Sequence, residues 1–495
     1  MKEVKRKKSK PNIIYILADD MGYGDLSCLN EESQIRTPNF DKLAQEGMIF
    51  TDAHSSSAVC TPSRYSIITG RYNWRSRLKS SVLGGYSPAL IESDRMTVAS
   101  MLKEKKYQTA CIGKWHLGLD WGRTSVEPEA AGFTVTEGIN YSAPIKNGPV
   151  DHGFDCFYGI SASLDMPPYV YIENDRVTEL PDHETENTGK KFWRKGPTAP
   201  NFKHEEVLPK LTEKVLDTID DWSGKPFFIY FPLPAPHTPI LPTGEFIGKS
   251  QTNSYGDFVL MCDDVVGQVM KKLEEKNLAE DTIVIYTSDN GCSPMADFEE
   301  LAECGHNPSY IFRGHKADIY EGGHRIPLLV KWPDMIKEGS VSDEPVCLTD
   351  LMATVAEIVG YQLPDNAAED SISNLPVWFA DDYTKPLREA TVHHSINGSF
   401  SLRKGKWKLE MCPGSGGWSD PKPGEEPEGA PAIQLYDLEV DISEENNVYD
   451  NYPDVVEDMK RLLIKYIKEG RSTAGEPQEN TGPDYWEQLH WMENK

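Results

Sequence analysis

The chain has 495 residues, of which 38% are apolar and 26% charged, enough apolar material for one large domain and a smaller one. Its 51 basic and 78 acidic side chains give a formal net charge of −27, which disfavours nucleic acid as a partner because the surface repels phosphate backbones. No apolar run reaches the roughly 18 residues that cross a bilayer, so we expect no membrane span.

The start of the chain and its cysteines bear on location. Met1–Lys10 is basic, but the apolar run that follows, Ile13–Ala18, is too short for the core of a signal peptide. We therefore expect a cytoplasmic location for the sequence as written, and a periplasmic or secreted one if the N-terminus has been trimmed. The nine cysteines are scattered without a CxxC pair, a pattern that indicates neither a disulfide framework nor a zinc ribbon.

Compact apolar runs alternate with amphipathic stretches along most of the chain. In chain order we expect a strand at Asn12–Leu17, helices at Asn39–Glu46 and Met96–Lys105, a strand at Thr109–Ile112, a helix at Glu205–Trp222, a strand at Phe227–Phe231, a helix at Tyr255–Leu278, strands at Thr282–Thr287 and Leu328–Trp332, and a helix at Leu348–Val359. This alternation predicts an α/β fold with a large, mostly parallel sheet sandwiched by helices. The Gly-, Pro- and polar-rich segments Asp120–Val150 and Glu173–Pro200 are expected to be surface insertions.

The pattern changes after a linker at Gly360–Pro376. Strand-like runs follow at Ser399–Leu402, Trp407–Met411 and Gln434–Leu438, and an amphipathic helix runs from Pro453 to about Glu469. We therefore predict a large domain over residues 11–375 and a C-terminal α+β subdomain over residues 376–495, built on a small antiparallel sheet with the helix packed on it.

Acidic and amide side chains directly follow two of the expected strands. The first strand ends in Asp19 and Asp20, and the fourth in Asp289 and Asn290. Ligands of an open α/β sheet bind outside the carboxyl ends of its strands, so four oxygen donors would meet at one edge. Without His or Cys in either pair, Ca²⁺ or Mg²⁺ is favoured over zinc. Either pair alone could be ordinary turn chemistry.

Cationic side chains gather near the ends of the other strands. Lys114 and His116 follow the second strand, His237 follows the third between two prolines, and Lys316 and Arg325 precede the fifth. A lone Lys or His is usually a solvated or internally satisfied group. Several at one edge would supply the positive pocket that an acidic protein needs to hold a sulfate or phosphate dianion.

The most specific motif is Cys60-Thr61-Pro62-Ser63-Arg64, followed by Thr69-Gly70-Arg71. Cys-x-Pro-Ser-Arg is expected by chance in on the order of 0.001 of chains of this length. With it, the sequence resembles the type I, formylglycine-dependent sulfatases of the alkaline phosphatase superfamily, in particular bacterial polysaccharide and arylsulfatase A-like enzymes. The resemblance spans nearly the whole chain and also rests on Ala18–Asp25, Gly113–His116, the His237 loop, Ser288–Gly291 and Lys316–Pro327.

The resemblance implies a metal and a modified nucleophile. A maturation enzyme would oxidise Cys60 to formylglycine, whose hydrate attacks the sulfur of a sulfate ester. One Ca²⁺ would be bound by the modified Cys60 together with Asp19, Asp20, Asp289 and Asn290, and Asp289 would accept the proton of the attacking hydroxyl.

The resemblance also implies roles for the basic residues that match the family's motifs. Arg64 would stabilise the aldehyde hydrate, and Lys114 and Lys316 would neutralise the sulfate oxygens. His237 would protonate the departing alcohol, and His116 would take the proton of the second hydroxyl as the enzyme-bound sulfate ester collapses.

The expected substrate is a sulfated carbohydrate. Ser161–Arg176 and Trp193–Asn201 resemble the corresponding stretches of bacterial polysaccharide sulfatases, and imply an exo-acting enzyme on sulfated galactose or N-acetylgalactosamine. We expect Trp115, Arg325 and His394 to contact the substrate. Further candidates for stacking on a sugar are Tyr23, Tyr169, Trp193 and Trp222.

Two other functions stay open at this point. A phosphoesterase or phosphonate monoester hydrolase of the same superfamily can use the same nucleophile, and the cationic pocket fits phosphate as well as sulfate. A non-catalytic glycan-binding relative would be indicated by loss of Cys60, Arg64 or a metal ligand, but all of these are present.

Overall fold

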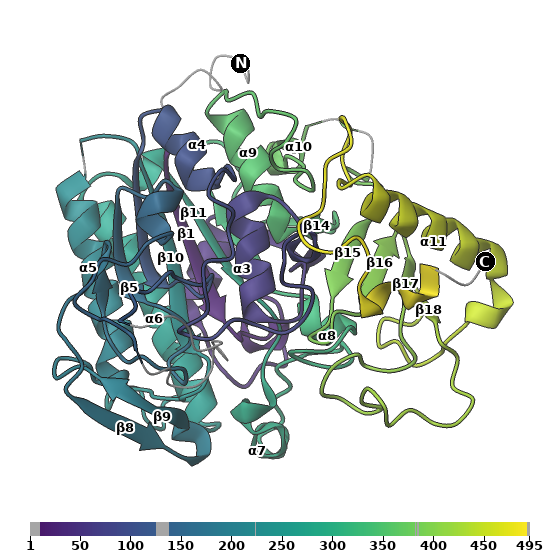
Figure 1. Cartoon of the computed structure of the whole chain (residues 1–495), viewed down its shortest axis with the longest axis horizontal. Helices are drawn as coiled ribbons and strands as arrows, with labels where there is room; N and C mark the ends of the chain where they lie inside the picture. The colour runs from purple at the N-terminus through teal and green to yellow at the C-terminus, as the bar shows by residue number, and fades with distance from the viewer. Residues whose placement is uncertain (1–9, 125–137, 223, 382, 384–385, 493–495) are drawn as a thin grey trace.

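The computed structural model describes residues 10–124, 138–222, 224–381, 383 and 386–492. A large sheet at its centre contains strands β1 (Asn12–Asp19), β2 (Met48–Phe50), β4 (Gln108–Lys114), β5 (Cys156–Ile160), β6 (Ile172–Glu173), β7 (Arg176–Val177), β10 (Phe227–Pro236), β11 (Thr282–Ser288), β12 (Leu328–Lys331) and β13 (Ser340–Ser342). These ten strands lie in the order β13-β2-β12-β11-β1-β10-β4-β5-β6-β7 (Figure 1). Residues 1–9, and residues 125–137 of the first expected insertion, lie outside the described residues.

The middle of the sheet is parallel. Strands β11, β1, β10, β4 and β5 run in one direction, and the central strand β1 is buried along its whole length, which explains its unbroken apolar sequence. At the edges β12 pairs antiparallel with β11, and β6 antiparallel with β5. The prediction of a mostly parallel sheet is confirmed. Because β12 runs the other way, the residues that precede it lie at the same edge as those that follow the parallel strands.

Helices cover both faces of the sheet (Figure 1). One layer contains α2 (Pro38–Gln45), α5 (Val207–Trp222) and α6 (Ser254–Glu275), which pack on one another. The other contains α3 (Cys60–Thr69), α4 (Val98–Glu104) and α9 (Leu351–Ile358). Shorter helices are α7 (Phe298–Glu303), α8 (Glu321–His324) and α10 (Leu375–Trp378). In the part of the chain that the structure describes, no helix is both long and apolar enough to cross a bilayer.

A second, four-stranded sheet lies beside the large one (Figure 1). It is antiparallel, in the order β15 (Thr391–His394), β16 (Phe400–Lys404), β17 (Trp407–Glu410) and β18 (Gln434–Asp437). Helix α11 (Pro453–Lys468) packs on β16 and β17 through the apolar face that its spacing predicts. The C-terminal α+β architecture is therefore confirmed, with β15 as an additional strand. The boundary between residues 375 and 376 stays a prediction.

Two small elements complete the fold. The hairpin β8 (His183–Asn187) with β9 (Trp193–Thr198) forms most of the second expected insertion. The short strands β3 (Ala53–His54) and β14 (Val346–Cys347) pair parallel with each other. Strand β3 ends six residues before α3 begins, so its pairing with β14 restrains the segment that leads into that helix.

Ile16 tests the burial of the central strand. Its side chain is fully buried, and its neighbours across the sheet are Phe231 on β10 and Tyr286 on β11. We expect Ile16→Ala to lower the free energy of unfolding by about 2–5 kcal/mol in urea titrations, because it removes buried methyl groups and leaves a cavity. Val341→Ala, at an exposed position of edge strand β13, should change it by no more than about 0.5 kcal/mol. A loss of stability for Ile16→Ala as small as that control would contradict the assigned packing.

Candidate active site

The two carboxylate and amide pairs meet at the carboxyl edge of the sheet. Asp19 ends β1 and Asp20 follows it, while Asp289 and Asn290 directly follow the neighbouring strand β11. The Asn290 side-chain amide donates to Asp20 Oδ1 at 2.7 Å, and the Asp20 backbone amide donates to Asp289 Oδ1 at 3.3 Å. All four side chains are buried, so four oxygen-bearing groups share a small volume away from solvent.

This group fits a divalent metal ion. Asp19 Oδ1 and Asn290 Oδ1 are buried and accept no hydrogen bond from the described residues. One ligand atom each from Asp19, Asp20, Cys60 and His237 lies within 4.8 Å of the others. Buried oxygens without donors are costly unless a cation compensates them, and a mainly oxygen donor set suits a hard cation.

Three cations surround these carboxylates. Lys114 Nζ lies 2.6 Å from Asp19 Oδ2, and Lys316 Nζ lies 2.6 Å from Asp20 Oδ1. Arg64 Nε donates to Asp289 Oδ2 at 2.9 Å, and Arg64 Nη1 donates to the backbone carbonyl of Lys114, also at 2.9 Å. The charges of these three positive and three negative side chains cancel, so a bound divalent cation would give the site a net positive charge that suits an anionic ester.

Burial and charge shift the carboxyl pKa values in opposite directions. Burial raises the pKa of Asp289 to about 7, and the charge of Asp19 adds to this, while Arg64 opposes it. Burial also favours the neutral form of Asp19, but Lys114, His237 and Arg64 outweigh it and hold the Asp19 pKa well below its usual value. A divalent cation beside these groups would favour the ionised form of both.

Cys60 is the first residue of α3, and the motif around it explains how that helix begins. Pro62 lies in the first turn, where a missing backbone N–H costs no intrahelical hydrogen bond. Ser63 Oγ donates to the Ser57 carbonyl at 2.9 Å and ties the incoming loop to the helix. Gly70, with φ of 66°, ends the helix in the left-handed region. Burial raises the pKa of the Cys60 thiol to about 12, so an unmodified Cys60 is a weak nucleophile.

Two histidines are oriented by backbone carbonyls. His237 Nδ1 donates to the Thr238 carbonyl at 2.5 Å, and His237 Nε2 lies 3.7 Å from Asp20 Oδ2. His116 Nε2 donates to the Leu83 carbonyl at 2.6 Å. Burial holds the pKa of His116 well below its usual value, so the ring is neutral. Its Nδ1 therefore carries a lone pair, and it has no hydrogen-bond partner among the described residues.

A cavity of about 430 Å³ opens onto this group. Cys60, His237 and Lys316 line it, together with Asp165, Met166, Phe192, Arg194, Met295 and Trp418. Another cavity, of about 410 Å³, is lined by Pro11, Glu280 and Asp281, which precede β1 and β11. That second cavity therefore lies at the amino ends of the strands, away from the carboxylates. The first is the one that gives a ligand access to Cys60.

The sequence model of the sulfatase family matches residues 11–361, which include Cys60 and all the acidic, amide and basic residues described above, but not Trp418 of the cavity lining. This chain belongs to the sulfatase family. Its members hydrolyse sulfate esters, and the cationic, oxygen-rich site is consistent with that chemistry.

Individual relatives support the same assignment. The sulfatase is 34% identical to an N-acetylgalactosamine-6-O-sulfatase of Bacteroides thetaiotaomicron, over 92% of each chain. It is 30% identical to the steryl-sulfatase of Homo sapiens, over 74% of this chain and 70% of that one. A solved structure connected with the metabolism of multiple glycosaminoglycans by Bacteroides thetaiotaomicron matches with a TM-score of 0.79 and 32% identity, over 92% of this chain and 99% of that chain. The expected alkaline phosphatase-like fold is confirmed.

The structure does not bring the three expected substrate contacts to the cavity. Trp115 lies in the hydrophobic core, where its indole N–H donates to the Gly118 carbonyl at 3.1 Å. Arg325 is buried and pairs with Asp52 and Glu321. His394 is also buried, with its ring edge-on to Phe400 at a centroid distance of 4.5 Å. These side chains are occupied by packing and ion pairs and do not line the cavity, so their contact with the substrate stays a prediction.

The expected stacking aromatics are likewise engaged elsewhere. Tyr23 and Tyr169 are buried, Trp193 stacks on His204 at 3.8 Å between centroids, and Trp222 packs against the core. The exposed indole at the cavity is Trp418, which the sequence analysis missed.

Trp418 is brought to the cavity by one buried carboxylate. Its backbone amide donates to Asp318 Oδ1 at 2.7 Å, and that of Ser419 donates to the same oxygen at 2.9 Å. Asp318 lies near Lys316 in the chain, so the Gly- and Pro-rich loop of the C-terminal sheet is held beside Lys316. The only signal in the sequence was an aromatic residue within that loop, and it does not say where the loop lies.

Proposed function

We propose that this sulfatase hydrolyses the 6-sulfate ester of N-acetylgalactosamine or galactose at the end of a sulfated carbohydrate chain. The observation that carries the proposal is the cavity lined by Cys60, His237 and Lys316, because Cys60 and His237 lie close to the carboxylates of Asp19 and Asp20 at the end of β1. The substrate rests on the 34% identity to an N-acetylgalactosamine-6-O-sulfatase, which extends over 92% of both chains. Trp418 at the cavity offers a flat apolar surface for a sugar ring.

We propose that Cys60 acts after oxidation to formylglycine by a maturation enzyme. Two observations support this: Cys60 begins the Cys-x-Pro-Ser-Arg motif at the start of α3, and burial makes its unmodified thiol a weak nucleophile. In hydrated form, formylglycine supplies two hydroxyls on one carbon, one to attack sulfur and one to expel the sulfate without a separate water. A serine in the same place has only one hydroxyl.

Asp19, Asp20, Asp289 and Asn290 would hold the metal, which we propose is Ca²⁺. Their oxygens, two of them buried without hydrogen-bond donors, support a hard cation. When bound, the cation supplies positive charge that orients the sulfate and lowers the pKa of the attacking hydroxyl. Arg64 keeps Asp289 in place through its two-point ion pair.

The basic side chains stabilise charge on the sulfate and transfer protons. Lys114 and Lys316 place positive charge where the sulfate oxygens gain negative charge as the ester bond breaks. His237 Nδ1 donates to the Thr238 carbonyl, so Nε2 of the ring in its imidazolium form is the atom that gives a proton to the departing sugar oxygen. His116 is neutral, and its unpartnered Nδ1 is the acceptor for the proton of the second hydroxyl.

A panel of matched esters tests this proposal. The enzyme should cleave N-acetylgalactosamine 6-sulfate with a kcat/KM at least tenfold above that for the 4-sulfate, and on the order of 100-fold above that for the 6-phosphate, because a phosphate monoester near pH 7 carries more negative charge than a sulfate monoester. Cys60→Ala protein, purified in parallel, sets the background of contaminating activity.

Other outcomes of the panel would overturn the proposal in distinct ways. Faster hydrolysis of the phosphate would identify a phosphoesterase of the same superfamily. Binding of the sugars without turnover by protein whose Cys60 is oxidised would identify a glycan-binding relative. Preference for the 4-sulfate would retain the sulfatase but reject the 6-position.

A further inference from the structure

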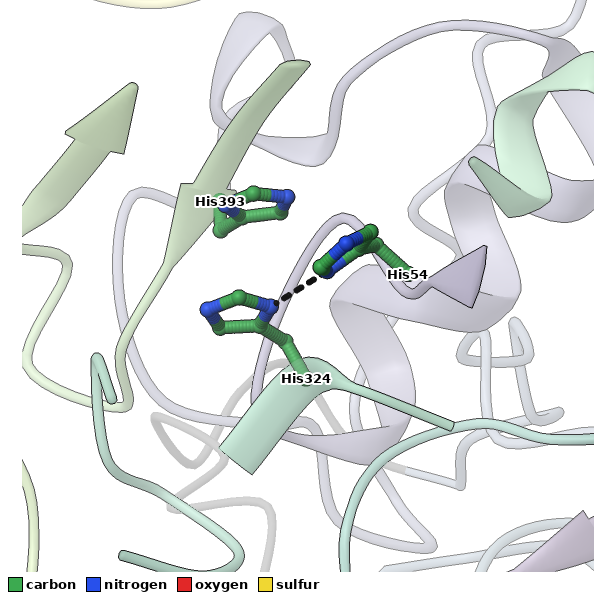
Figure 2. Close-up of side chains that lie close together, drawn as sticks. All are labelled: His54, His324 and His393. Atoms are coloured by element: carbon green, nitrogen blue, oxygen red, sulfur yellow. Dashed lines mark hydrogen bonds between the residues drawn. The ribbon is translucent and has the colours of Figure 1, made fainter. Parts of the chain in front are cut away.

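Three buried histidines from distant parts of the chain meet outside the catalytic cavity. His54 ends β3, His324 ends α8 and His393 lies in β15 of the C-terminal sheet (Figure 2). All three are fully buried, and one ring nitrogen from each lies within 4.8 Å of the others. No step of the sulfatase reaction uses them.

Hydrogen bonds define the tautomers of two of these rings. His54 Nε2 lies 2.6 Å from Asp52 Oδ1, and His324 Nε2 lies 3.1 Å from the Ile319 carbonyl. A carboxylate and a carbonyl can only accept, so each Nε2 carries the hydrogen. A Nη1 nitrogen of Arg325 also lies 3.1 Å from His54 Nε2, but the carboxylate oxygen is closer and decides the tautomer. Both Nδ1 atoms of the neutral rings therefore carry lone pairs.

These two lone pairs face each other. His54 Nδ1 and His324 Nδ1 are 3.0 Å apart (Figure 2), a spacing that is repulsive between two acceptors unless a cation lies between or beside them. Two imidazole nitrogens that share a tetrahedral zinc ion at 2.0–2.1 Å are separated by about 3.3 Å. The observed spacing is therefore close to that of a pair of metal ligands.

His393 supplies a third nitrogen. Its ring stacks on His324 with centroids 3.9 Å apart, and its Nδ1 lies 3.2 Å from Ser401 Oγ. Its Nε2 is buried and has no hydrogen-bond partner among the described residues. With Nδ1–H donating to Ser401, Nε2 is free to coordinate. A carboxylate, a carbonyl and a hydroxyl would then each orient one ring, the arrangement that commonly supports metal-bound histidines.

The surroundings favour a metal over a shared proton. Burial lowers the pKa of His54 to about 4 and holds those of His324 and His393 well below the usual value, so the rings are neutral at pH 7. Asp52 and Glu321 are nearby anions that pair with Arg325, Arg403 and Lys408, and Lys408 also pairs with Glu410 and Glu444. Neutral imidazole is a preferred ligand of zinc and other late first-row metals, whereas calcium prefers oxygen.

We propose that His54, His324 and His393 bind one transition-metal ion, Zn²⁺ by preference, in a structural site separate from the catalytic metal. Three imidazoles leave a fourth position for water. The ion would connect the C-terminal sheet to the segment that leads into α3 and Cys60. The backbone already joins the same elements, through bridges between His54 and Arg325 and between Ser57 and His394.

Metal analysis of the full-length protein tests the site independently of sulfatase activity. All variants carry Cys60→Ala, which removes the thiol at the catalytic centre as a zinc ligand, and are kept in excess Ca²⁺ to fill the oxygen site. After expression with added Zn²⁺ and gel filtration without chelator, elemental analysis should find about one zinc per chain. His324→Gln and His393→Gln should each lower this at least tenfold, with circular dichroism unchanged.

His152→Gln is the matched control. His152 is also buried with an unpartnered Nε2, but it does not belong to the cluster, so this variant should keep its zinc. Another late first-row metal at one per chain, lost with the same two variants, supports the site equally. Absence of such a metal from the protein without cluster substitutions, or unchanged zinc in His324→Gln, overturns the proposal.

If the cluster variants fail to fold, X-ray absorption at the zinc edge of the Cys60→Ala protein without cluster substitutions tests the proposed ligands. Nitrogen neighbours at about 2.0–2.1 Å with imidazole scattering are expected. A zinc environment of oxygen alone would place the ion elsewhere and reject the site.

Discussion

Cys60→Ala should reduce turnover of a sulfate ester by on the order of 10⁴-fold or more while leaving the fold intact. The change removes the precursor of the nucleophile, and among the described residues that line the cavity Cys60 carries the only thiol. The lost volume is small, and the neighbouring ion pairs of Arg64, Lys114 and Lys316 do not involve the cysteine. Initial rates on an aryl sulfate, with circular dichroism as the check on folding, measure the effect.

Two further cysteine variants serve as comparisons for this prediction. Cys156→Ala, at a half-buried cysteine of β5, should keep kcat/KM within about twofold, because that thiol is remote from the carboxyl edge. Cys60→Ser should also be poor, since serine needs a different maturation enzyme and, unmodified, offers one hydroxyl instead of two. Mass spectrometry of the peptide with residue 60 distinguishes thiol from aldehyde in the wild type. More than trace activity in Cys60→Ala would reject the nucleophile.

Removal of the divalent cation should lower both activity and melting temperature. Without it, the carboxylates of Asp19, Asp20 and Asp289 share a buried volume, and Asp19 Oδ1 and Asn290 Oδ1 accept no hydrogen bond from the part of the chain that the structure describes. Calcium at 100 times its dissociation constant would stabilise the folded state by about 2.7 kcal/mol. Thermal melts after exhaustive chelation, with and without added Ca²⁺ or Mg²⁺, measure the change. Identical melts would argue against the oxygen-ligand site.

The response to calcium should depend on pH in a defined direction. Burial raises the pKa of Asp289 to about 7, so below that pH protons compete with the cation for this carboxylate. The gain in melting temperature on adding calcium should therefore be larger at pH 8 than at pH 6. Asp20→Ala should abolish the gain, whereas Asp94→Ala, at an exposed aspartate, should preserve it. A larger gain at pH 6 would contradict this assignment.

The chemistry of the site was predictable because it lies in short local patterns. Asp19 and Asp20 directly end a strand, as do Asp289 and Asn290, and the carboxyl ends of parallel strands must share one edge. Cys60 and Arg64 lie within one turn of one helix. The positions of these residues can be predicted from neighbouring residues in the sequence, because they do not depend on long-range packing.

The substrate contacts could not be predicted in the same way. Trp115 and His394 follow or form strands near the site, yet one side chain points into the core and the other packs on Phe400. Trp418 reaches the cavity because Asp318 holds its loop, a contact across 100 positions of the chain. The orientation of an aromatic side chain depends on the residues that surround it in the folded protein. A local sequence pattern does not identify those residues.

By itself, the sequence determined the α/β class, the order of the main strands along the chain and the edge of the sheet at which Asp19, Asp20, Asp289 and Asn290 gather. These follow from the periodicity of apolar residues and from motifs that lie within a few residues of each other. Only the tertiary structure decided that β12 runs antiparallel, which brings Lys316 to the site, and that His54, His324 and His393 meet. Those outcomes depend on contacts between segments tens to hundreds of residues apart, and such contacts form only when the whole chain packs.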